Sequence, residues 1–305
     1  MTAEPFLRWA GGKRWLARRI APLIRLRLSG VYREPFLGGG SMFFATEPSQ
    51  AVLSDINSEL ISTWIQVRDN ADELLRLIRA LPIDATTYYK IRADRAGSHV
   101  DRAARFIYLN RCCYGGLYRT NRKGEFNVPF GGGSRTPAPL WECHQLTNAS
   151  KAMSDCDLNL CTEDFGVALL EAQYGDVCFL DPTYMAATRG PFDRYNPKLF
   201  TWDDQARLSH AARAAAKRGV VVVISNVDCP EVRQLYSGEL TVSLIRSKAI
   251  GNAVRNSRSQ HELLIVYDAP EWHEAWARVA VDGQLFTSQL ELLADTAPLL
   301  KPLAV

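Results

Sequence analysis

The stretch Val177-Cys178-Phe179-Leu180-Asp181-Pro182-Thr183-Tyr184 decides how this 305-residue chain is organised. It runs through four apolar residues to a carboxylate, a proline and a phenol. A short apolar run bounded by turn residues predicts a buried parallel strand, and ligands of open α/β sheets bind just past the carboxyl ends of such strands. Asp181 and Tyr184 therefore stand where a functional site is expected. Taken alone, the pattern fits an Asp-Pro turn with a surface tyrosine equally well.

Strand and helix patterns alternate on both sides of this stretch, which predicts an α/β fold. The last two predicted strands are expected to form a β-pair with each other. The sheet is therefore expected to be built from both ends of the chain, with a small domain inserted between. The predicted strands are 31–34, 51–55, 158–161, 177–180, 220–224, 240–245 and 262–267, and the predicted helices are 13–28, 58–81, 166–173 and 204–217.

The composition is that of an ordinary globular protein, with 47% apolar and 23% charged residues. The sequence has no run of about 18 apolar residues, and its basic N-terminus lacks the apolar core of a signal peptide. A cytoplasmic protein is expected. The seven cysteines form no CxxC pair, and Cys112 and Cys113 are adjacent. This pattern argues against a zinc site and a disulfide framework, so reduced thiols are expected.

A run of three glycines, Gly38 to Gly40, follows the strand predicted at 31–34 and precedes a helix. The next predicted strand ends at Asp55. This order of strand, glycine turn, helix, strand and acid is typical of a nucleoside site, where the acid accepts hydrogen bonds from ribose hydroxyls. The spacing differs from GxGxxG and fits an adenosyl ligand without a pyrophosphate better. A flexible loop with Asp55 as a helix cap is the alternative.

The region 84–150 is basic and rich in aromatic residues. It holds ten Lys and Arg residues against five Asp and Glu residues, whereas the whole chain carries a net charge of only +3. Such a local excess is typical of a polyanion partner, although a solvated helical face gives the same count. The pattern over residues 117–128 predicts a β-hairpin that turns at 121–124. A basic hairpin of this kind with aromatic residues can enter a groove of DNA. A loop at 185–201 is expected to cover substrate, and a basic loop at 246–258 is expected to contact phosphates.

Four separated blocks make the chain resemble the Dam-like (D12 class) DNA adenine-N6 methyltransferases. The blocks are 6–13 (FLRWAGGK), 34–41 (EPFLGGGS), 109–129 (LNRCCYGGLYRTNRKGEFNVP) and 181–184 (DPTY), in the order typical of that family. The resemblance implies a Rossmann-like sheet with helices on both faces, S-adenosyl-L-methionine (AdoMet) as cofactor and double-stranded DNA as partner. It also implies a catalytic domain formed by 1–60 and 151–270, and an inserted, mainly helical target-recognition domain at 61–150 that carries the hairpin. No role is predicted for the tail at 271–305.

The resemblance also assigns roles to individual residues. Asp181 and the Pro182 carbonyl would accept the two N6 hydrogens of a flipped-out adenine, and Tyr184 would stack on its ring. Arg119 would read a guanine through O6 and N7. The implied cofactor residues are Trp9 and Lys13 at the methionine moiety, Gly38 and Gly40 as a backbone cradle, Asp55 at the ribose, Asp164 and Phe165 at the adenine, and Asp181. The implied DNA-binding residues are Leu117, Arg119, Asn121, Arg122, Lys123 and Arg255.

Two departures from the family pattern leave alternatives open. Thr183 stands where the family has a second proline, and Gly115 stands where GATC-methylating members usually have asparagine. The alternatives are an inactive relative that binds DNA or AdoMet, and a methyltransferase acting on RNA or protein glutamine, whose catalytic motif typically begins with Asn. The target is expected to resemble GATC and to contain a guanine. A cognate restriction endonuclease or other defence component is an expected partner, and a monomer or weak dimer is the expected state.

Overall fold

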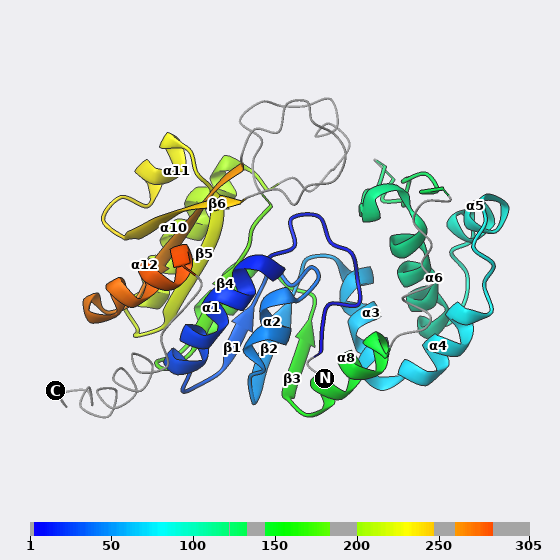
Figure 1. The fold of residues 1–305 in the computed structure, drawn as a ribbon, viewed down its shortest axis with the longest axis horizontal. Coiled ribbons are helices and arrows are strands. Elements are labelled where there is room, and N and C mark those ends of the chain that lie inside the picture. Colours follow the sequence, from blue (N-terminus) through cyan, green and yellow to red (C-terminus); the bar gives the residue numbers. More distant parts are fainter. Residues whose placement is uncertain (1–2, 122, 133–143, 184–199, 247–259, 283–305) are drawn as a thin grey trace.

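A seven-stranded sheet forms the centre of the computed structural model, which describes residues 3–121, 123–132, 144–183, 200–246 and 260–282 (Figure 1). The strand order is β3-β2-β1-β4-β5-β7-β6. Neighbours from β3 to β5 are parallel, while β7 runs antiparallel to both β5 and β6. The predicted α/β fold and terminal β-pair are thus confirmed. The strands are β1 Tyr32–Glu34, β2 Gln50–Ser54, β3 Asp157–Cys161, β4 Val177–Leu180, β5 Val221–Val227, β6 Leu240–Arg246 and β7 Gln260–Tyr267.

Strand β4 is buried on both faces, which explains its unbroken apolar sequence. Val177 and Phe179 belong to one hydrophobic core, and Cys178 and Leu180 belong to a second core on the opposite face. The predicted covering of both faces by helices is therefore confirmed. The first core is covered by α1 (Arg14–Arg27), α2 (Ser41–Thr46) and α12 (His273–Asp282), and the second by α9 (Phe165–Glu171), α10 (Trp202–Ala216) and α11 (Pro230–Leu235).

Several helices lie between β2 and β3 in the sequence and gather beside the β3 end of the sheet (Figure 1). The single helix predicted over 58–81 is wrong, because Asn70 leaves the helical conformation at φ −136° and divides it in two. The apolar faces of both resulting helices pack on α6 and belong to the same hydrophobic core. The helices are α3 Ser58–Asp69, α4 Ala71–Arg79, α5 Ala85–Ala93, α6 His99–Cys112 and α8 Gln145–Ser154.

The predicted hairpin at 117–128 is a short antiparallel loop. One bridge pairs Thr120 with Phe126, and the Asn127 amide donates to the Arg119 carbonyl at 3.1 Å. Asn121 closes the turn, since its side-chain oxygen accepts from the backbone amides of Lys123 at 2.9 Å and of Glu125 at 3.0 Å. The side chain of Asn121 is therefore committed to the shape of the loop.

The segment after β7 is anchored to the first helix. Trp272 and Trp276 are buried, and the Trp276 indole donates to Asp268 at 2.8 Å. Arg27 of α1 forms an ion pair with Asp268 at 2.7 Å and lies over the Trp272 ring. Residues 270–282 thus complete the core over α1. No helix in the described ranges is long and apolar enough to cross a membrane.

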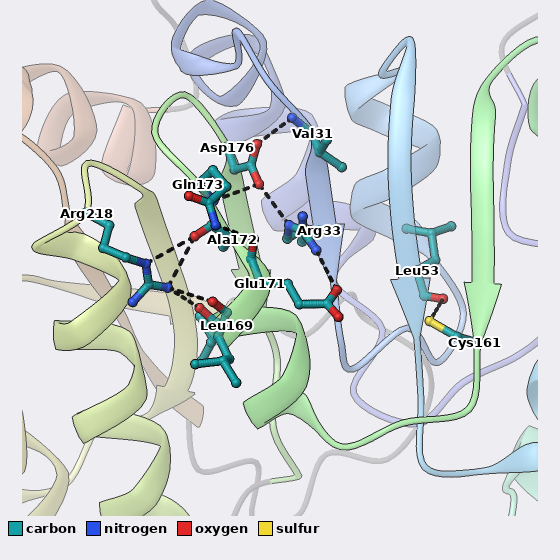
Figure 2. A network of polar contacts seen from close by, with 11 residues as sticks. Val31, Arg33, Leu53, Cys161, Leu169, Glu171, Ala172, Gln173, Asp176 and Arg218 are labelled. Atoms are coloured by element: carbon teal, nitrogen blue, oxygen red, sulfur yellow. Dashed lines mark hydrogen bonds and ion pairs between the residues drawn. The ribbon is translucent and has the colours of Figure 1, made fainter.

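A buried ion pair fixes the amino end of β4 (Figure 2). Arg33 of β1 contacts Asp176 at 2.9 Å, and both side chains are less than one-tenth exposed. Asp176 also accepts hydrogen bonds from the backbone amides of Val31 at 2.7 Å and Gln173 at 3.1 Å. On the other side, Arg218 donates to backbone carbonyls at the end of α9. These bonds hold β4 against β1 and α9.

Replacing Asp176 by asparagine keeps the shape of the side chain but leaves the buried Arg33 guanidinium without its nearest counter-charge. We expect Asp176→Asn to lower the free energy of unfolding by about 3 kcal/mol, measured by urea denaturation. The matched control is Asp155→Asn, which breaks an exposed pair with Lys151 at 2.8 Å and should cost below about 0.5 kcal/mol. Equal losses in the two variants would contradict the assignment of Asp176.

Candidate active site

A cavity of about 1030 Å³ opens at the carboxyl ends of β1, β2 and β4. The sheet order reverses between β1 and β4, and ligands of open α/β sheets bind at such a switch point. All the residues predicted to bind cofactor line this one cavity, although they come from distant parts of the chain. They are Trp9, Lys13, Gly38, Gly40, Asp55, Asp164, Phe165 and Asp181.

The glycine turn after β1 is held tightly by its neighbours. Gly38 and Gly40 have positive φ angles of 46° and 64°. A Cβ atom on Gly38 would lie 2.7 Å from the Trp9 ring, and one on Gly40 would lie 2.3 Å from the Trp64 ring. The turn therefore requires glycine both for its backbone conformation and for the close approach of two indoles.

Asp55 binds the same turn from the end of β2. Its carboxylate accepts hydrogen bonds from the backbone amides of Gly38 at 3.2 Å and Asn57 at 3.0 Å. Burial raises the pKa of Asp55, and these two hydrogen bonds oppose the rise. The carboxylate thus organises the glycine turn and still lines the cavity, where it can accept a hydrogen bond from a hydroxyl group.

An aromatic cluster around Phe165 forms one wall of the cavity. The Phe165 ring stacks on Phe36 at 5.4 Å and contacts Phe200 at 5.9 Å between ring centroids. Arg207 lies over the Phe165 ring at 4.1 Å and forms an ion pair with Asp164 at 2.5 Å. The pair lowers the pKa of Asp164. Such a wall offers an apolar surface against which a planar heteroaromatic ring can pack. The sequence analysis missed Phe36, Phe200 and Arg207, which come from three separate segments.

Asp181 extends β4 to the cavity and meets a buried cation. The Lys13 ammonium lies 3.1 Å from the Asp181 carboxylate, 3.5 Å from the Glu262 carboxylate and 2.9 Å from the Gly11 carbonyl oxygen. Burial raises the pKa of Asp181 to about 6, against the opposing effect of Lys13. Asp181 is therefore mostly ionised at neutral pH. The sequence analysis missed Glu262, which stands at the start of an apolar strand.

A second buried carboxyl group, that of Glu34 on β1, also lies at the cavity. The Glu34 carboxyl accepts hydrogen bonds from the Tyr32 hydroxyl at 2.8 Å and the Phe43 amide at 2.9 Å. Burial raises the pKa of Glu34 to about 8, with a smaller contribution from Asp181. Glu34 is thus mostly protonated at neutral pH and adds little negative charge to the cavity.

The predicted DNA-binding residues are only partly gathered at the cavity. Arg119 and Lys123 line it, and Arg119 donates to the Asn127 side chain at 2.7 Å. Leu117 is 40% exposed and lies outside the lining, as does Asn121. Tyr118 of the same loop stacks on Trp9 at 5.5 Å, which joins the loop to the cofactor side.

The structure describes two more residues of the motif at 181–184. Pro182 is buried, Thr183 is exposed, and both line the cavity. Tyr184, Arg122 and Arg255 lie outside the described residues, as does nearly all of the loop predicted at 185–201. Among the residues that the structure does describe, no cluster of His, Cys, Asp and Glu side chains could hold a metal ion.

Residues 9–251 match the model of the D12 class N6 adenine-specific DNA methyltransferases. The chain belongs to this family. Members of the D12 class use AdoMet as methyl donor and DNA as substrate, and the present chain is a DNA methyltransferase of that class. The family resemblance predicted from the four sequence blocks is confirmed.

Individual relatives of the D12 methyltransferase align along most of its length. The DNA adenine methylase of Escherichia coli K12 is 35% identical over 86% of this chain and 94% of its own. A type II methyltransferase of Lactococcus lactis subsp. cremoris is 33% identical over 86% and 94% of the two chains. A type II methyltransferase of Methanocaldococcus jannaschii is 32% identical over 87% and 99%.

The glycine turn gives a test of the cavity's construction. We expect Gly40→Ala to lower the free energy of unfolding by about 2–4 kcal/mol in urea denaturation, because it adds a clash with the buried Trp64 ring to the strain of a positive φ. Gly238→Ala is the control, since Gly238 has φ 95° and open space around its Cβ position. It should cost only about 1 kcal/mol.

A double-mutant cycle separates the clash from the strain. In a Trp64→Phe background, which removes the ring atom nearest to the added methyl group, Gly40→Ala should cost about as little as Gly238→Ala. A Gly40→Ala penalty that is the same with Trp64 and with Phe would show that the indole does not restrict the turn.

Proposed function

We propose that this D12 methyltransferase transfers a methyl group from AdoMet directly to N6 of an adenine flipped out of duplex DNA. The observation that carries the proposal is the position of Asp181. Its carboxylate shares one cavity with the glycine turn and Asp55, and it is mostly ionised at neutral pH. A hydrogen-bond acceptor of this kind is what an exocyclic amine requires as positive charge develops on its nitrogen.

The cavity has separate features that fit each part of AdoMet. The glycine turn has no room for side chains beside Trp9 and Trp64, and its backbone lines the cavity, where a ligand can approach it closely. The Asp55 carboxylate suits the ribose hydroxyls. The aromatic wall at Phe165 suits the adenine ring, and Trp9 and Lys13 line the part of the cavity that would take the methionine part. AdoMet, when bound, supplies an electrophilic methyl group on a sulfonium centre.

The residues of the catalytic motif would orient the amine. The N6 nitrogen is a poor nucleophile because its lone pair is delocalised into the adenine ring. Hydrogen bonds from N6 to the Asp181 carboxylate and the Pro182 carbonyl would draw the nitrogen toward tetrahedral geometry, and most of the rate gain would come from this positioning. Tyr184 would stack on the flipped base, a contact worth about 1–3 kcal/mol.

We also propose that residues 61–150 form the target-recognition domain. This region holds the local excess of basic residues, and its loop places Arg119 and Lys123 at the cavity. Arg119 would read a guanine in a GATC-like target. Gly115 has φ 70°, a conformation that asparagine and glycine adopt most readily. Glycine in place of the family's asparagine thus keeps the backbone and removes one amide from the recognition loop.

Methyl transfer itself is the first test. Purified protein should move labelled methyl groups from AdoMet to unmethylated duplex DNA, and Asp181→Asn should lower kcat by about 100-fold, because the amide replaces an anionic acceptor. The Asp181 pKa is raised, so the carboxylate is protonated below pH 6 and ionised above it. Activity should therefore fall as the pH drops through about 6, and this acid limb should be absent from the residual activity of Asp181→Asn.

The same assay decides between this proposal and an inactive relative. Wild-type protein that binds DNA without turnover, together with activity in Thr183→Pro, would establish the inactive relative. Wild-type turnover on DNA, with Thr183→Pro changing only the rate, would establish the methyltransferase. Sequencing that detects N6-methyladenine in DNA from expressing cells then identifies the target.

Base reading gives a second test, with Lys123 as the matched control. Arg119→Gln should lower discrimination for the guanine-containing site by about 10- to 100-fold in competition binding, since a bidentate contact is worth about 1–3 kcal/mol. AdoMet affinity should be unchanged. Lys123→Gln should instead weaken binding to all duplexes alike and reduce the salt dependence of binding by about one phosphate contact. Identical sequence preference in Arg119→Gln and wild type would refute the reading role.

A further inference from the structure

Glu262, on strand β7, adds a third charged side chain to the buried pair of Lys13 and Asp181. It stands near the start of β7, in register with Val227 of β5 and Leu244 of β6. Because β7 is antiparallel, its first residues lie at the edge of the sheet where the parallel strands end. The Glu262 and Lys13 side chains are each only 4% exposed, and their charged atoms are 3.5 Å apart.

The Lys13 ammonium is shared among acceptors that are not equivalent. It contacts the Asp181 carboxylate at 3.1 Å, the Glu262 carboxylate at 3.5 Å and the Gly11 carbonyl at 2.9 Å. A lysine that faced Asp181 alone would neutralise it and compete with any other donor for its oxygens. Division of the same cation between two carboxylates leaves part of the Asp181 charge uncompensated.

The cluster of Lys13, Asp181 and Glu262 carries one positive and two negative charges when both carboxylates are ionised. A buried carboxylate is unfavourable unless a positive charge or hydrogen-bond donors meet it. Glu34 adds little negative charge, because burial raises its pKa to about 8. The proposed reaction brings positive charge to Asp181, first on the sulfonium of AdoMet and then on the reacting nitrogen. A carboxylate that Lys13 does not fully neutralise suits this charge.

We propose that Glu262 is a positioning residue for methyl transfer, which draws the Lys13 ammonium away from Asp181 and so reserves the Asp181 carboxylate for the substrate amine. The inference rests on the proposed function, because it concerns the same carboxylate. Glu262 acts through Lys13 and is not expected to touch the substrate.

The groups that face Asp181 determine how its titration responds to a change at Glu262. Burial has the largest effect and raises the Asp181 pKa, Lys13 at the start of α1 lowers it, Glu262 on β7 raises it, and a hydrogen bond with Ser225 on β5 lowers it. Glu34 on β1 interacts electrostatically with Asp181. Loss of the Glu262 charge removes one influence that raises the Asp181 pKa and leaves Lys13 to pair with Asp181 alone.

Glu262→Gln tests the inference, because glutamine keeps the shape of the side chain without its charge. We expect kcat to fall by about tenfold, with KM for DNA and affinity for AdoMet within about twofold of wild type. The acid limb of the pH profile should move to lower pH. Glu262→Asp retains the charge and should recover the wild-type acid limb. A residue that only stabilises the fold would not move this limb.

The control variant removes a carboxylate at the opposite end of the β6–β7 strand pair. Glu239 precedes β6 and forms an ion pair with Arg213 at 3.3 Å, with both side chains partly buried. Glu239→Gln should leave kcat and the acid limb unchanged, whatever its effect on stability. Thermal unfolding of all variants with AdoMet present confirms that each is folded at the assay temperature.

The outcomes separate the inference from the proposed function. Wild-type protein without methyl transfer refutes the function. An active wild type with unchanged kcat and acid limb in Glu262→Gln refutes the role of Glu262 alone. If Glu262→Gln is unfolded at the assay temperature, its pH profile and that of wild type are compared at a lower temperature at which both are folded: an acid limb at lower pH than in wild type supports the inference, and a wild-type acid limb overturns it.

Discussion

The burial of β4 on both faces is the constraint from which the location of the site follows. Its alternate residues belong to two separate cores, so no position within Val177–Leu180 can carry a polar side chain without loss of packing. Phe179 gives the cavity an apolar surface, and the first polar side chain to reach it is Asp181, which is one-fifth exposed. The buried pair of Arg33 and Asp176 fixes the other end of the strand. The position of the Asp181 carboxylate is thus set by the packing of β4, whose four side chains are all apolar.

The charge at this position depends on segments that are far apart in the sequence. Lys13 precedes the first helix and Glu262 opens β7, so the ammonium meets its two carboxylates only when the sheet is complete from β1 to β7. The segment after β7 returns to α1, where Asp268 binds Arg27 and Trp276 is buried. The position of Lys13 at the start of α1 is therefore supported from the end of the described chain. This closure allows a cation and two carboxylates to remain buried together.

The sequence predicted those features that local patterns encode. Short strand patterns of a few residues predicted every strand of the sheet. The glycine run with Asp55 predicted where the cavity would open. Each of these signals depends on a few consecutive residues. The break at Asn70 was missed because apolar residues on either side of it keep helical spacing. Glu262 was missed because its partner Lys13 lies 249 residues away in the sequence, and Arg207 was missed because its partner Asp164 lies 43 residues away. A charged residue beside an apolar run is usually solvated, so neither residue stood out in the sequence.

Thr183 stands where the family has a second proline, but the fold restrains the rest of the motif without that proline. The proposed acceptors of the amine hydrogens are the Asp181 carboxylate and the Pro182 carbonyl. Asp181 is held by β4 and by Lys13, and Pro182 is buried, whereas Thr183 is exposed at the cavity. A proline at the third position would fix one more backbone angle of the motif, but the fold already restrains the two residues before it. The electrostatics at Asp181 thus depend on Lys13 and Glu262 rather than on the residue at position 183.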